Sequence, residues 1–316
     1  MAAITVAPPG QGGAASYPGR SRQVVFTADD FGLSPALNNA VALAHRFGLL
    51  RSASLMPAAP ASGQAFALSR RFPSLCLGVH LTLIQGRAVL PPRDLPRLVD
   101  AAGRFPSDPV RTGWRYYFDP GLLPEIRREL RAQIEAVLDA GLSVWHLNGH
   151  LNLHLHPRVA PLVVNLAREY HIPALRLARE DWRTTLALAP EGPFPKAALG
   201  CIFAVLCRRT KALAESAGLL VNDYLFGLTH HGRLTEDYLV NLVPRLQPGL
   251  TEIYCHPALA ADSLLVQAAP GYRRQQEFTA LVSPRLRETL ERYGIEVTDF
   301  REVVQQRRSA TGQFSP

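Results

Sequence analysis

Short apolar runs alternate along the chain with longer segments whose apolar residues recur at helical spacing. The apolar runs predict buried strands at residues 24–26, 52–56, 75–81, 144–147, 175–177, 253–255 and 295–298. Between them, the periodicity predicts helices that start after Ser34 and at 61–71, 122–140, 159–171, 196–217 and 284–293. Short buried strands joined by amphipathic helices are typical of a parallel sheet with helical crossovers.

This alternation predicts one α/β domain over residues 23–304. The architecture that fits its size best is a closed or nearly closed (β/α) barrel, regular or irregular, and an open doubly wound sheet is the alternative. Residues 91–120 are rich in turn formers and read as a long irregular insertion. Residues 1–22 and 305–316 are expected to be a disordered leader and a disordered tail.

Composition narrows the classes of function. The chain has 34 Lys and Arg against 26 Asp and Glu, and only Lys196 and Lys211 are lysines, so arginine carries the net charge of +8. No basic run is interleaved with aromatic residues, so nucleic acid is not an expected partner. The glycine signatures that bind dinucleotides or nucleoside triphosphates do not occur in the sequence, which argues against those cofactors.

The expected location is the cytoplasm. Cys76, Cys201, Cys207 and Cys255 form no CxxC pair, which indicates free thiols in a reducing compartment. We expect no signal peptide, and no run reaches the roughly 18 apolar residues that a membrane-spanning helix needs.

Chemically active side chains lie where predicted strands end. They are Asp29, Asp30, His80, Asn148, His150, Arg176 and His256. Because the carboxyl ends of parallel strands meet on one rim, we expect these side chains to form one site.

One carboxylate and two imidazoles can hold a divalent cation and leave positions open for water and substrate. A second carboxylate can then accept a proton from water, and a further histidine can protonate a leaving amine. Asp29, Asp30, His80, His150 and His256 supply this complete set, which suits metal-assisted hydrolysis of an amide.

Each signal also has a simpler interpretation. The two aspartates could cap the helix that begins near Ser34, and His80 could be a hydrogen-bonded structural residue. The spacing of His150, His154 and His156 favours a metal, although His154 could equally support a neighbouring ligand.

Four segments resemble the motifs of YdjC-like carbohydrate deacetylases, in the same order and over roughly residues 23–300. They are Thr-Ala-Asp-Asp-Phe-Gly at 27–32, Gly-Val-His-Leu at 78–81, His-Leu-Asn-Gly-His at 146–150 with His154, and Tyr-Cys-His-Pro at 254–257. The segments 51–56, 89–92, 153–157 and 249–258 resemble the branch of that family associated with hopanoid biosynthesis.

The resemblance implies a (β/α)-barrel deacetylase with one divalent cation, with magnesium favoured and zinc an alternative. Its ligands would be Asp30, His80 and His150, with Asp29 as general base and His256 as general acid. It implies an N-acetylated amino sugar as substrate and, in the hopanoid branch, an N-acetylglucosaminyl hopanoid lipid. Most relatives carry Asp where this chain has Asn148, which leaves the tuning of His150 open.

Three further residues are expected to support the site or contact substrate: Asn148, His154 and Arg176. Arg176 is expected to orient Asp29 electrostatically. Two rival functions remain open at this point. A non-haem iron oxygenase uses a similar ligand set, usually on an all-β fold, and a non-catalytic sugar- or lipid-binding relative would need neither base nor acid.

Residues 197–207 are apolar on every side and are followed by basic residues 208–211. A buried core helix is the favoured interpretation. Peripheral contact with the inner face of a membrane is the alternative, supported by aromatic residues of the insertion. Those aromatic residues are Trp114, Tyr116, Tyr117 and Phe118.

Overall fold

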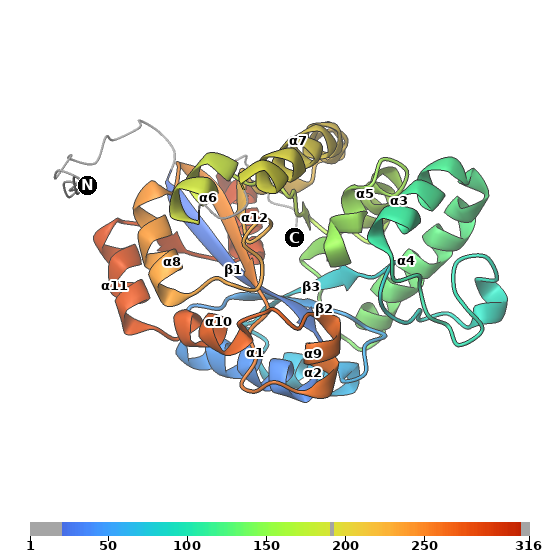
Figure 1. Cartoon of the computed structure of the whole chain (residues 1–316), viewed down its shortest axis with the longest axis horizontal. Helices are drawn as coiled ribbons and strands as arrows, with labels where there is room; N and C mark the ends of the chain where they lie inside the picture. Colours follow the sequence, from blue (N-terminus) through green and yellow to red (C-terminus); the bar gives the residue numbers. More distant parts are fainter. Residues whose placement is uncertain (1–20, 190–192, 311–316) are drawn as a thin grey trace, which may run out of the picture.

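The computed structural model describes residues 21–189 and 193–310, and a curled parallel sheet forms the centre of the molecule (Figure 1). The strands are β1 (Arg22–Phe31), β2 (Ser52–Leu55), β3 (Cys76–Leu81), β4 (His146–Gly149), β5 (Ala174–Leu175), β6 (Leu220–Val221), β7 (Tyr224–Phe226), β8 (Gly249–Cys255) and β9 (Glu296–Val297). Their order is β6-β5-β4-β3-β2-β1-β8-β7, and β9 pairs with β1. All these pairings are parallel.

The two edges of the curled sheet approach each other. After β5 the chain runs alongside β7, where the backbone N–H of Leu225 donates to the carbonyl of Arg179 (2.8 Å) and Glu180 forms an isolated parallel bridge with Leu225. The curled sheet confirms the predicted single-domain (β/α) barrel, in an irregular form, over the open doubly wound sheet.

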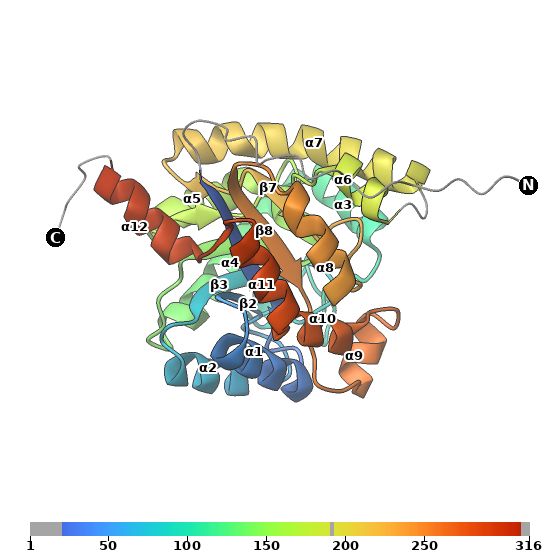
Figure 2. The same ribbon diagram turned by 90° about the vertical axis from the view of Figure 1, so that its left-hand side faces the viewer.

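Helices surround this sheet (Figures 1 and 2). They are α1 (Pro35–Phe47), α2 (Ser62–Arg71), α3 (Pro109–Phe118), α4 (Leu123–Leu138), α5 (Ala160–Glu169), α6 (Trp182–Leu188), α7 (Pro193–Ser216), α8 (Glu236–Leu242), α9 (Ser263–Ala268), α10 (Arg274–Leu281), α11 (Pro284–Arg292) and α12 (Phe300–Ala310). The 3-10 segments are η1 (Pro92–Asp94), η2 (Pro120–Leu122), η3 (His150–Leu155) and η4 (Val243–Arg245). Among the described residues, no helix has both the length and the apolarity to cross a membrane.

The start of α1 shows how local chemistry places the site. Ser34 is extended, and its hydroxyl accepts the backbone N–H of Leu37, while Pro35 takes the first helical position. A serine cap followed by proline is a strong helix start. Ser34 therefore caps α1, and the aspartates at the end of β1 are left for other contacts.

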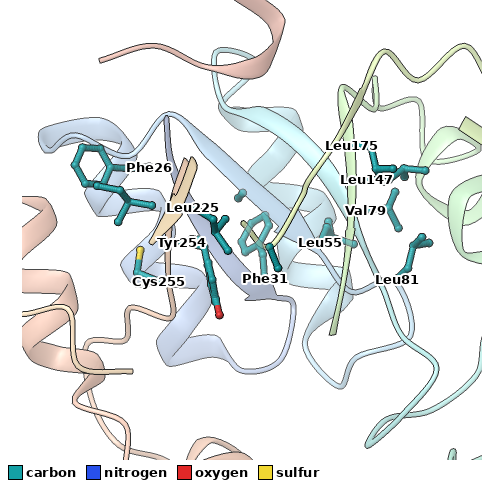
Figure 3. Packing of buried hydrophobic residues seen from close by; sticks show 14 of the residues in the cluster. Phe26, Phe31, Leu55, Val79, Leu81, Leu147, Leu175, Leu225, Tyr254 and Cys255 are labelled. Atoms are coloured by element: carbon teal, nitrogen blue, oxygen red, sulfur yellow. The ribbon is translucent and has the colours of Figure 1, made fainter. Parts of the chain in front are cut away.

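The core lies on both sides of the strands. Figure 3 shows side chains from β1, β2, β3, β4, β5, β7 and β8 packed in the large cluster, including Phe31, Leu55, Val79 and Leu147. A smaller cluster joins Val25, Cys76 and Leu250, near the starts of their strands, to Phe300 of α12. Helix α12 thus covers the amino-terminal end of the barrel and leaves the carboxyl-terminal end for chemistry.

Several element predictions differ from the structure. The insertion at 91–120 contains α3 as well as irregular turns, and α12 makes residues 305–310 helical where a disordered tail was expected. Residues 311–316 and 1–20 lie outside the described part of the chain. All four cysteines are free: Cys76, Cys207 and Cys255 are buried, and Cys201 is exposed.

Candidate functional site

The carboxyl ends of the central strands bring the polar side chains of the sequence motifs together. Asp29 and Asp30 lie near the end of β1, His80 lies near the end of β3, Asn148 lies in β4, His150 begins η3, Arg176 follows β5 and His256 follows β8. Six of these seven residues are classed as buried, and His150 is partly buried.

The end of β1 departs from regular strand geometry. The β1–β2 register shifts between Ala28 and Phe31, and Asp30 has a left-handed φ of 59°. Successive side chains of a regular strand point to opposite faces. The irregularity and the left-handed residue allow both Asp29 and Asp30 to reach the same site.

Asp30, His80 and His150 form a candidate metal centre. One Asp30 oxygen lies 3.4 Å from His80 Nε2 and 3.2 Å from His150 Nδ1. One ligand atom from each residue lies within 4.8 Å of the others. Two imidazoles and a carboxylate at this spacing fit a single divalent cation.

The electrostatics of the centre favour a charged carboxylate. Burial alone would raise the pKa of Asp30, but His150, His256 and His80 together hold it well below its usual range. Burial lowers the pKa of His80, whereas for His150 the attraction and hydrogen bond of Asp30 outweigh burial and raise the pKa. The carboxylate is therefore ionised and available as a ligand.

Asn148 fixes the orientation of His80. Asn148 Oδ1 lies 2.8 Å from His80 Nδ1, so that ring nitrogen donates and Nε2 is left with its lone pair toward Asp30. The Asn148 amide nitrogen donates to Ser54 Oγ (2.7 Å) and to Asp29 Oδ1 (3.3 Å). One amide thus accepts from the histidine and donates to the neighbouring aspartate.

Asp29 is held by a buried ion network. Arg176 donates to both oxygens of Asp29 (2.5 and 2.9 Å) and to Glu252 Oε1 (2.7 Å), while the Thr27 hydroxyl also donates to Glu252. The guanidinium lies 4.7 Å from the ring centre of Tyr254. Burial raises the pKa of Asp29, but the Arg176 charge and hydrogen bonds lower it overall, so Asp29 is ionised.

Glu252 was not among the residues predicted from the sequence. It lies inside the apolar run of β8 and is fully buried. A carboxylate within an otherwise apolar buried strand was the available signal, because such residues are rarely buried without a partner.

His256 lies close to the metal centre but outside it. Its Nε2 is 4.0 Å from Asp30 Oδ2, and its ring centre lies 5.7 Å from that of Tyr254 and 4.9 Å from that of Tyr272. The His256 backbone N–H donates to Glu277 (2.7 Å). Burial lowers the pKa of the His256 ring to about 3, so the ring is neutral at neutral pH.

The other histidines of the cluster do not join the centre. His154 is buried and contacts the Arg176 carbonyl through Nε2 (3.0 Å), and His156 contacts the Gly113 carbonyl at 3.1 Å. His154 therefore braces the backbone that carries Arg176.

A cavity of about 1260 Å³ opens beside the centre, with His150 in its lining. Its wall includes α9 and the insertion after β3, which contributes arginines. The lining arginines are Arg87, Arg97, Arg104 and Arg115. The cavity is large enough for a sugar, and its mixed lining offers hydrogen-bond donors at several points.

Fold and site together define an irregular α/β-barrel protein with a candidate metal centre at the carboxyl ends of its strands. Residues 23–292 match the family model described as YdjC-like protein, so the chain belongs to the YdjC-like family.

Relatives of the chain agree with this assignment. It is 31% identical over 287 residues to a carbohydrate deacetylase of Vibrio vulnificus, covering 89% of this chain and 96% of that protein. It is 29% identical to a carbohydrate deacetylase of Brevibacillus brevis, with 89% and 99% covered. A solved structure from Enterococcus faecalis, described as a putative cellobiose-phosphate cleavage protein, is 25% identical with a TM-score of 0.68 and covers 90% of this chain and 99% of that one.

Proposed function

We propose that this protein is a metal-dependent hydrolase that removes the N-acetyl group from an amino sugar. The observation that carries the proposal is a buried Asp-His-His centre with a second, ionised carboxylate, Asp29, held beside it by Arg176. Binding alone needs no such separate base. Hydrolysis breaks the amide C–N bond, forms a C–O bond from water, and yields acetate and the free amine.

Asp30, His80 and His150 would hold the divalent cation. Once bound, the cation would polarise the acetamide carbonyl and lower the pKa of a water molecule. The family resemblance favours magnesium, whereas two imidazole ligands also suit zinc.

Asp29 is the general base of this proposal. Arg176 donates a hydrogen bond to each oxygen of Asp29, which fixes the carboxylate in one orientation. Asn148 links Asp29 to the proposed ligand His80 through hydrogen bonds to both. An ionised carboxylate in a fixed position can accept a proton from water as it attacks the acetamide carbon.

His256 is the proposed proton donor to the departing nitrogen. Its ring is neutral at rest, so the proton that Asp29 takes from the attacking water has to reach this ring before the ring can pass a proton to the nitrogen. The Asp30 carboxylate 4.0 Å away stabilises the positive charge of the protonated ring. Tyr254 and Tyr272 pack against the ring and limit its rotation.

The proposed substrate is the N-acetylglucosaminyl head of a hopanoid lipid, deacetylated at the inner face of the membrane. The cavity is lined by His150 and by Arg115 of α3, so a substrate bound at the centre can extend toward α3. On the same helix, Trp114 and Phe118 stack with ring centres 5.5 Å apart and are 60% and 71% exposed. Exposed aromatic residues beside arginines are typical of a surface that contacts lipid headgroups.

The test is acetate release from an N-acetylglucosamine conjugate and from an N-acetylglucosaminyl lipid, with and without chelator. We expect release that chelator abolishes and that is faster on the lipid. Asp30→Asn and His150→Ala should lose both bound metal and turnover, whereas Asp29→Asn should keep the metal and lose at least about 100-fold in turnover, the usual contribution of a general base.

Metal content measured on the same preparations distinguishes the roles. If Asp29→Asn loses the metal and Asp30→Asn keeps it, the roles of the two aspartates are exchanged. A folded, metal-loaded protein that releases no acetate from either compound contradicts the hydrolase and favours the sugar- or lipid-binding alternative. Oxygen consumption with either compound would instead indicate the oxygenase.

A further inference from the structure

Helix α4 carries three buried polar side chains on one face. They are Glu125, Glu129 and Gln133, which are 7%, 0% and 1% exposed. Residues four apart lie one above the other on a helix, so the three form a continuous stripe, which we call the polar stripe. Polar side chains buried this deeply need hydrogen-bond partners. Most of their partners are backbone groups of residues 82–107, the segment that follows β3, which we call the wall segment.

Gln133 and Glu129 hold the first half of the wall segment. The backbone N–H of Thr82 donates to Gln133 Oε1 (2.8 Å), and Gln133 Nε2 donates to the Thr82 carbonyl (2.7 Å). One Glu129 oxygen accepts the backbone N–H of Val89 (2.8 Å), and the other accepts that of Leu90 (3.0 Å). Both oxygens of Glu129 are therefore used on the backbone of the wall segment.

Glu125 holds a later part of the same segment. Its Oε2 accepts the backbone N–H groups of Arg97 and Leu98, each at 3.0 Å. In Figure 1 the teal loops of the wall segment lie beside α4. The polar stripe thus contacts the wall segment at its start and at two points further along.

The two carboxylates of the polar stripe have no cationic partner. Among the described residues, neither Glu125 nor Glu129 forms an ion pair, and burial raises the pKa of Glu129. A buried carboxylate is unfavourable unless hydrogen bonds replace its lost water, and the backbone N–H groups of the wall segment supply them. The carboxylates are satisfied only while the wall segment stays in place, so they specify its conformation.

The wall segment has little regular structure of its own. It contains η1, and its two halves are joined by backbone hydrogen bonds from Ala88 to Gly103 and from Phe105 to Gly86, both 2.9 Å. It nevertheless supplies most of the residues that line the 1260 Å³ cavity beside the candidate metal centre. They include the apolar residues Pro96, Val99 and Pro106 and the arginines Arg87 and Arg104.

We propose that the polar stripe of α4 is a positioning element for substrate: it holds the wall segment in the shape that binds the alkyl chain attached to the acetylated sugar. This proposal rests on the proposed function. The described hydrogen bonds of Glu125 and Glu129 do not involve Asp30, His80 or His150. Changes at Glu129 should therefore affect how an extended substrate binds, and not the chemistry at the centre.

The experiment compares the methyl and octyl glycosides of N-acetylglucosamine on the metal-loaded, full-length protein, below the concentration at which the octyl compound forms micelles. Glu129→Gln keeps the size of the side chain but leaves one of its two backbone donors without an acceptor. It should raise KM for the octyl glycoside by about fivefold or more. KM for the methyl glycoside, and kcat on both, should change by less than about twofold, as expected when binding rather than transition-state stabilisation is lost.

Amide hydrogen exchange measures the wall segment directly. In Glu129→Gln, exchange within residues 82–107 should be faster by about tenfold or more, while exchange in the central strands stays as in wild type and shows that the barrel is folded. Glu135→Gln is the matched control, because it removes the same charge from the same helix and its described partner is Tyr170. It should match wild type in exchange and in both KM values.

The outcomes separate this proposal from the deacetylase function. Unchanged exchange in Glu129→Gln overturns the positioning role, and so does faster exchange with KM unchanged or raised equally for both glycosides. If wild type releases no acetate from either glycoside, the deacetylase proposal fails, and calorimetric affinities replace KM. A selective loss of affinity for the octyl glycoside in Glu129→Gln then still supports the polar stripe, whereas equal affinities in variant and wild type overturn it.

Discussion

Asn148 stands at a position where the family resemblance leads one to expect aspartate, and its contacts explain why an amide serves here. It accepts from His80 and donates to both Ser54 and Asp29. An aspartate could make the first contact but would set a second negative charge against Asp29 in a buried site. The amide keeps the histidine oriented without that repulsion.

Sequence reasoning found the residues at strand ends but not those that act through them. Asp30, His80 and His150 could be predicted because their residue types and their place after strands both point to a metal. Glu252 could not, because it lies inside a strand rather than at its end. Only the folded chain shows that Glu252 shares Arg176 with Asp29.

We expect Glu252 to influence the basicity of Asp29 through the arginine that the two carboxylates share. It shares Arg176 with Asp29, so Glu252→Gln leaves the arginine charge to act on Asp29 alone. Asp29 should then become a weaker base. We expect turnover at neutral pH to fall by roughly three- to tenfold, and the acidic limb of the pH–rate profile to move to lower pH.

Metal content should be unchanged in this variant, and Glu288→Gln, at an exposed position of α11, should behave as wild type. An acidic limb that stays in place or moves to higher pH would show that Glu252 does not act through Arg176 on Asp29.

At the scale of elements, the periodic helices and the longer strands could be predicted, and the shortest elements could not. Strands β5, β6 and β9 each span two residues, too few to show a period. Each of these short strands forms because the longer strand beside it offers backbone hydrogen-bonding groups to which it can pair. Helix α3 escaped prediction because prolines and glycines surround it, although Asp108 caps it well.

Helix α7 corrects the favoured interpretation of residues 197–207. Among its described side chains, Cys207 is buried and Phe203 and Leu206 pack against the core. Ile202 and Val205 are 58% and 72% exposed. The helix is therefore a core helix on one face only, and the other face is apolar and uncovered.

This exposed face carries the membrane prediction. Helices α7 and α3 lie toward the same end of the molecule in Figures 1 and 2. If that end contacts lipid, Val205→Glu and Phe118→Glu should each reduce flotation with anionic liposomes several-fold, because a charge replaces an inserted apolar group. Ala212→Glu adds the same charge at an exposed site nearer the end of α7 and should float as wild type. Equal flotation of all folded variants would contradict peripheral membrane contact.

At the scale of the whole molecule, the barrel is closed by α12 at one end and is chemically active at the other. His146 belongs to the closed side: its ring lies 4.6 Å from that of Phe300 and contacts Ser54 Oγ (3.0 Å). Gly78 makes this possible, since a Cβ there would lie 2.3 Å from His146 Nε2. The barrel interior thus contains neutral histidines as well as apolar side chains.

Because these buried histidines are neutral, we expect the folded protein to lose stability at acidic pH. Burial lowers the pKa of His146 and of His154 to about 3, whereas an unfolded histidine titrates near 6.5. Between these values the unfolded chain binds protons that the folded chain does not, so the free energy of unfolding should fall as pH falls below about 6.5. At pH 4.5 each histidine should account for about 2–3 kcal/mol.

Urea unfolding at pH 7.5 and pH 4.5 measures this loss. His146→Gln should reduce the difference between the two pH values, even if the variant is less stable at both. His171→Asn, at an exposed position with positive φ that Asn tolerates, should leave the difference as in wild type. An unchanged difference in His146→Gln would show that this ring is not the source.

The left-handed turn at Asp30 ties two neighbouring side chains to one backbone conformation. A residue at position 30 that avoids positive φ would let the strand straighten, and straightening would swing carboxylate 29 away from Arg176. The proposed proton acceptor and the proposed cation ligand are thus not independent of each other. Their replacements should combine non-additively, and Asn, which tolerates this conformation, is the substitution at position 30 that alters chemistry while preserving shape.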